Sequence, residues 1–333
     1  MEKEEKGKLK LAVYWGAACG GCCVSVLDVH EKLLDIVAVA DLVFWPIALD
    51  IKYADVQQMP DASIDVCLFN GAIRNSENEL MAVLLRQKSK ILVAYGSCAH
   101  MGGIPGLANF SNRDALFKRV YMDSESTENP EHITPQPKYD VKEGELEIPA
   151  FYNDVQTLRD VVCVDYYIPG CPPQSERLLE VFQAIASGAE LPSKESVVGA
   201  LDKSQCDECP RKKTDNKKVK QFFRPWEIED DGETCFLEQG VICMGPATRG
   251  GCGARCIEGN APCRGCYGPP PDVTDPGAKM MSAIATMIDS NDEDEINAIL
   301  DDIEDIAGTF YRFSLPSSIL RRKMIKKQLA EVE

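Results

Sequence analysis

Cysteine is the residue type with which this chain could do chemistry. Its 333 residues include 15 cysteines, and eight of them lie between Cys206 and Cys266. In an exported protein this density would indicate disulfides, but residues 1–6 are mostly charged and do not form the basic and apolar regions of an export signal. We therefore expect a cytoplasmic protein, in whose reducing surroundings clustered cysteines bind metal.

Four cysteines lie in glycine- or proline-marked loops, each of which follows an apolar run of strand length. They are Cys19 and Cys22 after residues 10–15, Cys98 after residues 91–95, and Cys171 after residues 161–168. If these runs are strands of one parallel sheet, the loops meet at one edge, where ligands collect. Four converging thiolates suit an iron–sulfur cluster or Zn²⁺. The alternative, ordinary packing cysteines, does not explain why all four lie in such loops.

The other eight cysteines fill two four-sulfur sites with none left over. They read Cys206-x2-Cys209-x25-Cys235-x7-Cys243 and Cys252-x3-Cys256-x6-Cys263-x2-Cys266. This spacing leaves open which cysteine serves which site. Zinc is an alternative, because Cys-x2-Cys pairs also occur in zinc ribbons. Prolines after Cys171 and Cys209 are typical of ferredoxin-type sites and favour iron.

The elements that must position the first four cysteines alternate between two apolar patterns. Short apolar runs predict strands at residues 10–15, 42–47, 64–69, 91–95 and 161–168. Helical spacing predicts helices at residues 24–37, 78–87 and 178–188. Strands that alternate with helices indicate a parallel sheet, so we predict a doubly wound α/β domain at residues 8–190. Cys67 and Cys163 lie inside predicted strands, and we interpret both as core thiols.

Two further parts follow this domain. Residues 191–276 have many glycines and prolines and few periodic apolar residues, so we expect an irregular iron–sulfur domain whose folding depends on bound metal. Residues 277–333 return to helical periodicity, and we expect a helical docking tail there.

Charge and hydropathy exclude some classes of partner. Lys and Arg number 36 against 53 Asp and Glu, a net charge of −17, which repels nucleic acid and anionic membrane surfaces. No apolar run approaches the roughly 20 residues of a membrane-spanning helix. We therefore expect neither a nucleic-acid partner nor a membrane span.

Three motifs around the first four cysteines carry a family resemblance. They are Cys19-Gly-Gly-Cys22 followed by Val26-Leu27-Asp28, Gly96-Ser97-Cys98-Ala99-His100-Met101-Gly102-Gly103-Ile104-Pro105-Gly106-Leu107, and Pro169-Gly170-Cys171-Pro172-Pro173. Together they resemble the small subunit of [NiFe] hydrogenases, whose core also occurs in the corresponding subunit of respiratory complex I. Residues 244–256 (MGPATRGGCGARC) and 262–269 (PCRGCYGP) are similar to the cytoplasmic methyl-viologen-reducing (F420-non-reducing) group.

The resemblance implies a flavodoxin-like first domain and three [4Fe-4S] clusters. It assigns ligands to a proximal cluster (Cys19, Cys22, Cys98, Cys171), a medial cluster (Cys252, Cys256, Cys263, Cys266) and a distal cluster (Cys206, Cys209, Cys235, Cys243). Cys206 stands where periplasmic relatives have His, and Cys256 stands where three-iron relatives have Pro. Cys23 departs from the pattern, because family members often have Glu or His there, and we interpret it as a spectator beside Cys22.

The resemblance also implies a role as the electron-transfer subunit of a cytoplasmic hydrogenase, an oxidoreductase. The large subunit would split H2, and electrons would pass from the proximal through the medial to the distal cluster, toward a [2Fe-2S] protein and a heterodisulfide reductase. A second hypothesis is a redox-relay subunit whose large partner has lost nickel, as in complex I, and the nickel content separates the two. A zinc-binding scaffold, the third hypothesis, would be colourless.

Overall fold

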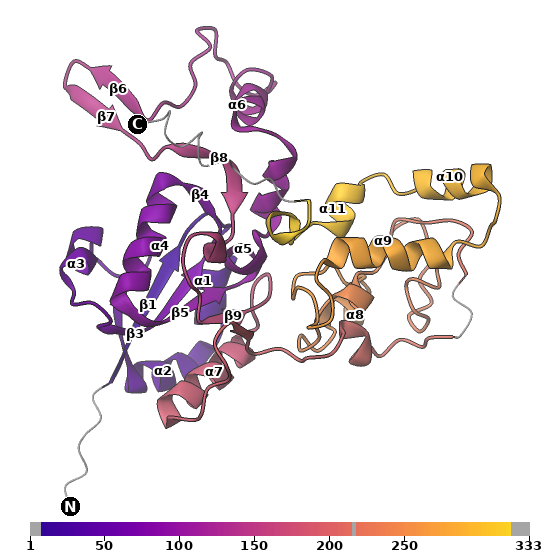
Figure 1. Cartoon of the computed structure of the whole chain (residues 1–333), viewed down its shortest axis with the longest axis horizontal. Coiled ribbons are helices and arrows are strands. Elements are labelled where there is room, and N and C mark those ends of the chain that lie inside the picture. Colours follow the sequence, from indigo (N-terminus) through magenta and orange to yellow (C-terminus); the bar gives the residue numbers. More distant parts are fainter. Residues whose placement is uncertain (1–7, 215–217, 321–333) are drawn as a thin grey trace, which may run out of the picture.

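The computed structural model describes residues 8–214 and 218–320. A sheet with helices on both faces forms the first part, and a loop-rich region beside the last helices forms the second (Figure 1). Within the described ranges, no helix is long and apolar enough to cross a bilayer.

Six parallel strands of the described chain form the main sheet. They are β1 (Leu9–Trp15), β2 (Ala40–Phe44), β3 (Ile64–Asn70), β5 (Ser89–Tyr95), β9 (Tyr166–Ile168) and β10 (Ser196–Val197). Their order is β10-β9-β5-β3-β1-β2, and all neighbours pair in parallel. This is the strand order of flavodoxin-like folds with one more edge strand, so the predicted fold class is confirmed. The added strand, β10, lies after position 190.

Both faces of the sheet are covered, which explains why its strands are apolar at nearly every position. Along β1, Leu11 and Val13 belong to the core on one face, and Ala12 and Tyr14 belong to the core on the other. Helices α1 (Gly21–Leu27), α2 (Leu33–Val39) and α7 (Ser175–Ser187) contribute to the first core, and α3 (Tyr53–Gln58) and α4 (Ser76–Lys88) contribute to the second.

The helix predicted at residues 24–37 is interrupted. The structure has α1, a 3-10 turn at His30–Lys32, and then α2. His30 has a φ of +54°, a left-handed conformation that does not continue a right-handed helix. Apolar spacing does not reveal this break, because the side chains on both sides of it pack against the same core.

The strand predicted at residues 161–168 is shorter in the structure and alters the place of one cysteine. Only Tyr166–Ile168 of this run form a strand, and Cys163 is an exposed residue before it, so the prediction of a core thiol at Cys163 is wrong. The run is apolar because Val161 and Val162 pack on the core from an irregular segment. Cys67 lies in β3 and is fully buried, so its interpretation as a core thiol is confirmed.

Several short elements have no clear sequence pattern. They are α5 (Ser97–Met101), α6 (Arg113–Tyr121), the antiparallel pair β4 (Ile73–Asn75) and β8 (Phe151–Gln156), and the hairpin of β6 (Lys138–Val141) and β7 (Gly144–Glu147). The hairpin projects away from the main sheet in Figure 1. Helix α5 positions a candidate ligand, because it begins just after β5 and carries Cys98.

The last helices share a core with the cysteine-rich region, which contains α8 (Arg255–Glu258). These helices are α9 (Pro276–Met287), α10 (Glu293–Asp301) and α11 (Ile306–Phe310), and the described part of the tail ends at residue 320. Met280 and Ile284 of α9 are buried together with Phe222 and Val241. The cysteine-rich region therefore has apolar packing to stabilise it as well as any metal that it binds, and Figure 1 shows α9 lying along it.

Candidate metal centres

The thiols of Cys19, Cys22, Cys98 and Cys171 gather at the carboxyl edge of the main sheet. The loops that follow β5 and β9 are joined there, because the Ser97 amide donates to Gly170 O at 2.8 Å. Burial raises the pKa of Cys98 to about 12, and repulsion from Cys171 and Cys19 adds to the increase. Burial also raises the pKa of Cys22, and repulsion from the other three thiols and from Cys23 adds to the increase. We call these four the edge group.

Two glycines let sulfur atoms of the edge group lie against the backbone. Gly96 has a φ of +89°, and a Cβ there would clash with Cys22 Sγ. Gly103 has a φ of +58°, and a Cβ there would clash with Cys98 Sγ. Only glycine combines these backbone conformations with so close an approach. The loops thus form a cradle that fits sulfur ligands.

Cys23, like its neighbour Cys22, belongs to the core on one face of the sheet. Its side chain is buried in the core between α1 and the sheet, and Asn70 Nδ2 donates to its sulfur at 3.3 Å. Burial raises the pKa of the Cys23 thiol. Because its sulfur already has this partner at the end of β3, the structure favours a packing role for Cys23.

The eight downstream cysteines lie close together, and thiols of the four predicted to bind the distal cluster repel one another. Burial raises the pKa of Cys206 to about 12. Lys213 opposes this increase, and repulsion from Cys235, Cys209 and Cys263 adds to it. Burial likewise raises the pKa of Cys243, with repulsion from Cys206 and Cys235. We call these four cysteines (Cys206, Cys209, Cys235, Cys243) the outer group.

The remaining four cysteines lie between the other two groups. Burial raises the pKa of Cys266, and the thiols that add to the increase are Cys263, Cys256, Cys252 and, from the edge group, Cys171. Toward the outer group, the Cys263 amide donates to Cys243 Sγ at 3.3 Å. The middle group (Cys252, Cys256, Cys263, Cys266) therefore adjoins both neighbours, and the three groups form a row.

A hydrogen bond also ties the middle group to the sheet domain. Ser97 Oγ, next to Cys98, donates to the carbonyl oxygen of Cys266 at 2.6 Å. Because the two residues are far apart in sequence, this contact holds the cysteine-rich region against the edge of the sheet. The order of the three cysteine groups, from edge through middle to outer, thus depends on contacts between residues that are distant in sequence.

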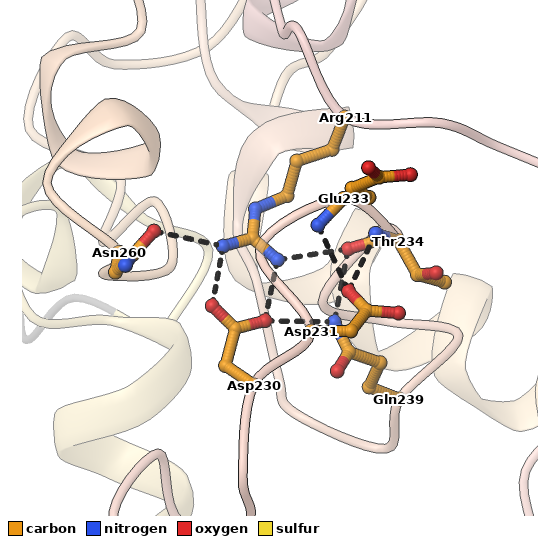
Figure 2. Close-up of polar contacts among 7 residues, drawn as sticks. All are labelled: Arg211, Asp230, Asp231, Glu233, Thr234, Gln239 and Asn260. Carbon is orange, nitrogen blue, oxygen red and sulfur yellow. Dashed lines mark hydrogen bonds and ion pairs between the residues drawn. The ribbon is translucent and has the colours of Figure 1, made fainter.

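An arginine organises the loops of the outer group, which have little regular secondary structure (Figure 2). Arg211, two residues after Cys209, binds both carboxylate oxygens of Asp230 at 2.6 Å and donates to Thr234 O at 2.9 Å. Its guanidinium lies over the Phe236 ring, 3.7 Å from the centroid. These contacts fix the segment that carries Cys235 relative to Cys209.

Side chains around Asp230 extend this network, as Figure 2 shows. Gln239 Nε2 donates to Asp230 Oδ1 at 3.0 Å and to Thr234 O at 2.9 Å. Asp231 Oδ1 accepts from the amides of Glu233 and Thr234. Hydrogen bonds from Arg211 hold the pKa of Asp230 well below its usual range, so this part-buried ion pair is kept at neutral pH.

The groups are not arranged as single-ion sites. Among the described residues, no three His, Cys, Asp or Glu side chains are placed to hold one metal ion.

Sequence reasoning missed the polar groups that surround the middle group. The carboxylate of Glu208 contacts the loop of Cys252, and its charge adds to the effect of burial, which raises the pKa of Cys252 to about 12. The Tyr267 hydroxyl is buried and has no hydrogen-bond partner among the described residues. Glu208 gave no signal in the sequence, because it occupies an unconstrained position of a Cys-x2-Cys pair.

Comparison with known proteins identifies the family. A family model described as NADH ubiquinone oxidoreductase, 20 Kd subunit, matches residues 19–185. The iron–sulfur subunit of the F420-non-reducing hydrogenase of Archaeoglobus profundus is 40% identical over 323 residues, which cover 96% of this chain and 99% of the relative. This chain belongs to the family of F420-non-reducing hydrogenase iron–sulfur subunits. The motif-based prediction of a hydrogenase small subunit is therefore confirmed, and with it the oxidoreductase class.

Further relatives of this hydrogenase small subunit extend the comparison. The corresponding subunit of the F420-non-reducing hydrogenase of Methanothermobacter marburgensis is 38% identical over 327 residues, 96% of this chain and 98% of the relative. Among solved structures, a chain of an NAD+-reducing [NiFe]-hydrogenase in the H2-reduced state is 28% identical, with a TM-score of 0.48, over 56% of this chain and 96% of that chain.

Proposed function

We propose that this subunit relays electrons from a hydrogenase large subunit through three [4Fe-4S] clusters. The edge group holds the proximal cluster, the middle group the medial cluster and the outer group the distal cluster. Clusters of this kind, when bound, take up and release electrons at potentials set by charge, hydrogen bonds and solvent exposure. The observation that carries the proposal is the row of thiol groups, in which the middle group adjoins both others.

The donor sets suit iron–sulfur clusters. Buried thiols such as Cys98 and Cys206 have raised pKa values, so without metal they keep their protons at neutral pH. Binding of a cationic cluster displaces these protons and offsets the repulsion between the thiolates. The glycine cradle at Gly96 and Gly103 provides the close backbone approach that such a group needs.

The edge group is the side on which we place the large subunit. Cys19 and Cys171 are exposed there. Exposed apolar side chains occur in the segments that carry the edge group or follow it, namely Trp15, Val24, Leu27, Ile104 and Phe110. A permanent subunit interface is typically large and apolar, so this edge fits a large-subunit contact. There H2 yields two protons and two electrons, and the electrons enter this chain.

We further propose a [2Fe-2S] protein and a heterodisulfide reductase as acceptors beyond the outer group, and a cytoplasmic location. Both rest on the likeness of residues 244–256 and 262–269 to the methyl-viologen-reducing group. A redox relay with a nickel-free partner is the second candidate, because the matching family model describes an NADH ubiquinone oxidoreductase subunit. Stoichiometric nickel in the purified native complex supports the first candidate, and its absence supports the second.

Metal analysis of that complex tests the cluster content. We expect about 12 iron atoms in this subunit and no zinc, because three groups of four thiolates suit three four-iron clusters. The measurement is elemental analysis together with the visible absorption of the purified protein. Stoichiometric zinc, or only about four iron atoms, would contradict the proposal.

Replacement of Cys256 by proline tests the middle group. We expect a three-iron cluster there, because one thiolate is lost from a site that keeps three. The fold should persist, since position 256 lies in the first turn of α8, where proline is tolerated. Electron paramagnetic resonance of the oxidised variant should show the three-iron signal, whereas a spectrum identical to that of the parent protein would mean that Cys256 is not a ligand.

A further inference from the structure

Glu208 connects two of the thiol groups. In sequence it lies between Cys206 and Cys209 of the outer group, but its side chain reaches the loop of the middle group. Its Oε2 accepts from the Gly251 amide at 3.0 Å, and its Oε1 accepts from the Cys252 amide at 3.1 Å. The same Oε1 lies 3.4 Å from Cys252 Sγ and 3.4 Å from the Ala254 amide.

These contacts have two electrostatic consequences for the middle group. First, the amides of Gly251 and Cys252 are directed to the carboxylate, so they are not free to donate to cluster sulfurs. Second, the Glu208 carboxylate lies 3.4 Å from Cys252 Sγ, the atom that the proposed function makes a cluster ligand. A cluster with fewer hydrogen bonds to its sulfurs accepts an electron less readily, and so does a cluster beside a negative charge. Both effects lower the reduction potential of a cluster bound by the middle group.

Arg177 is a cation near Glu208, and it already has other partners. Its Nη1 is already paired with Glu180 at 2.8 Å, and its Nε donates to Gly251 O at 3.2 Å. Glu208 is only half-buried, so solvent screens part of its charge, but Cys252 Sγ is in direct contact and is screened least.

We propose that Glu208 is a positioning residue that lowers the reduction potential of the medial cluster and fixes its Cys252 loop. The inference rests on the proposed function, because it takes the middle group as the ligands of a cluster. A carboxylate on the segment that carries the outer group would then set the reduction potential of the medial cluster.

The test is a redox titration of the purified complex carrying Glu208→Gln. The titration is done in the Cys256→Pro background, whose three-iron signal reports the medial site separately from the other clusters. We expect its midpoint to move to a more positive potential, with the iron content unchanged. A tenfold rise in the reduced-to-oxidised ratio at a fixed potential corresponds to about 59 mV for a one-electron couple.

Two further variants separate the effect of the Glu208 charge from the effect of changing the side chain at this position. Asp207→Asn removes a neighbouring carboxylate that accepts from Ser204 Oγ at 2.7 Å and has no contact with Cys252, so the midpoint should stay in place. Glu208→Asp keeps the charge on a shorter side chain, and the midpoint should stay close to that of Glu208. Iron content and the three-iron signal are measured for each variant alongside the titration.

The possible results test the role of Glu208 separately from the proposed electron-relay function. An unmoved midpoint in Glu208→Gln, or an equal shift in Asp207→Asn, would overturn the role of Glu208 and leave the relay intact. A parent complex without iron at the middle group would instead contradict the proposed function. Loss of the three-iron signal in Glu208→Gln together with its retention in Glu208→Asp would support the positioning role by showing that the carboxylate holds the loop.

Discussion

Replacement of Cys98 by serine is expected to remove the proximal cluster and to abolish H2-dependent reduction of a viologen dye by the complex. Cys98 lies in α5, directly after β5, and its thiol faces Cys19 and Cys171. A serine hydroxyl is a harder and less acidic ligand than a thiol, so it binds cluster iron less well than the thiolate it replaces. The iron content should fall by about four atoms of about 12, because each proposed cluster holds four.

Cys67→Ser is the matched control in the same sheet. Cys67 is fully buried in β3, and burial raises its pKa to about 12, as expected for an inert core thiol. The substitution should keep the iron and the activity, at a cost of about 1–3 kcal/mol in the free energy of unfolding for burying a hydroxyl. Ser89 lies close enough to pair with it, which favours the lower end of that range.

We would measure iron content, viologen reduction and thermal unfolding for both Cys98→Ser and Cys67→Ser. If Cys67→Ser lost the cluster while Cys98→Ser kept it, the argument that ligands follow strand ends would be wrong. If neither lost iron, the edge group would not be a metal site, although the fold would stand.

Gly96→Ala is expected to have a comparable effect without touching a ligand. The backbone of Gly96 has a φ of +89°, and the Gly96 amide donates to Ile168 O at 2.8 Å, so the chain cannot easily rotate away. An added Cβ would clash with Cys22 Sγ and displace that sulfur. We therefore expect loss of the proximal iron and of H2-dependent dye reduction, measured as for Cys98→Ser.

Gly232→Ala controls for backbone strain alone. Gly232 has a φ of +74°, and a Cβ there would meet nothing within 4 Å. The left-handed conformation should cost about 1–2 kcal/mol in the free energy of unfolding, with iron and activity retained. Equal iron loss in both variants would indicate general destabilisation and would contradict the sulfur cradle.

The strand-end cysteines could be predicted from the sequence because their positions follow from local periodicity. A strand signal is contained in a few neighbouring residues, and parallel pairing then brings the ends of β1, β5 and β9 to one edge. Cys19, Cys22, Cys98 and Cys171 could therefore be grouped from the amino-acid pattern alone. The same reasoning failed at Cys163, where valines pack on the core from a loop.

The sequence by itself determined the fold class, the family and the edge group, whereas the tertiary structure decided the row of three thiol groups, the shared core of the cysteine-rich region and tail, and the place of Glu208. The physical reason is the range of the interactions. Loops without periodicity are fixed by contacts between distant residues, such as Arg211 with Asp230 and Glu208 with Cys252. The spacing of the cysteines does not predict these contacts, because each contact joins residues that come together only when the chain packs.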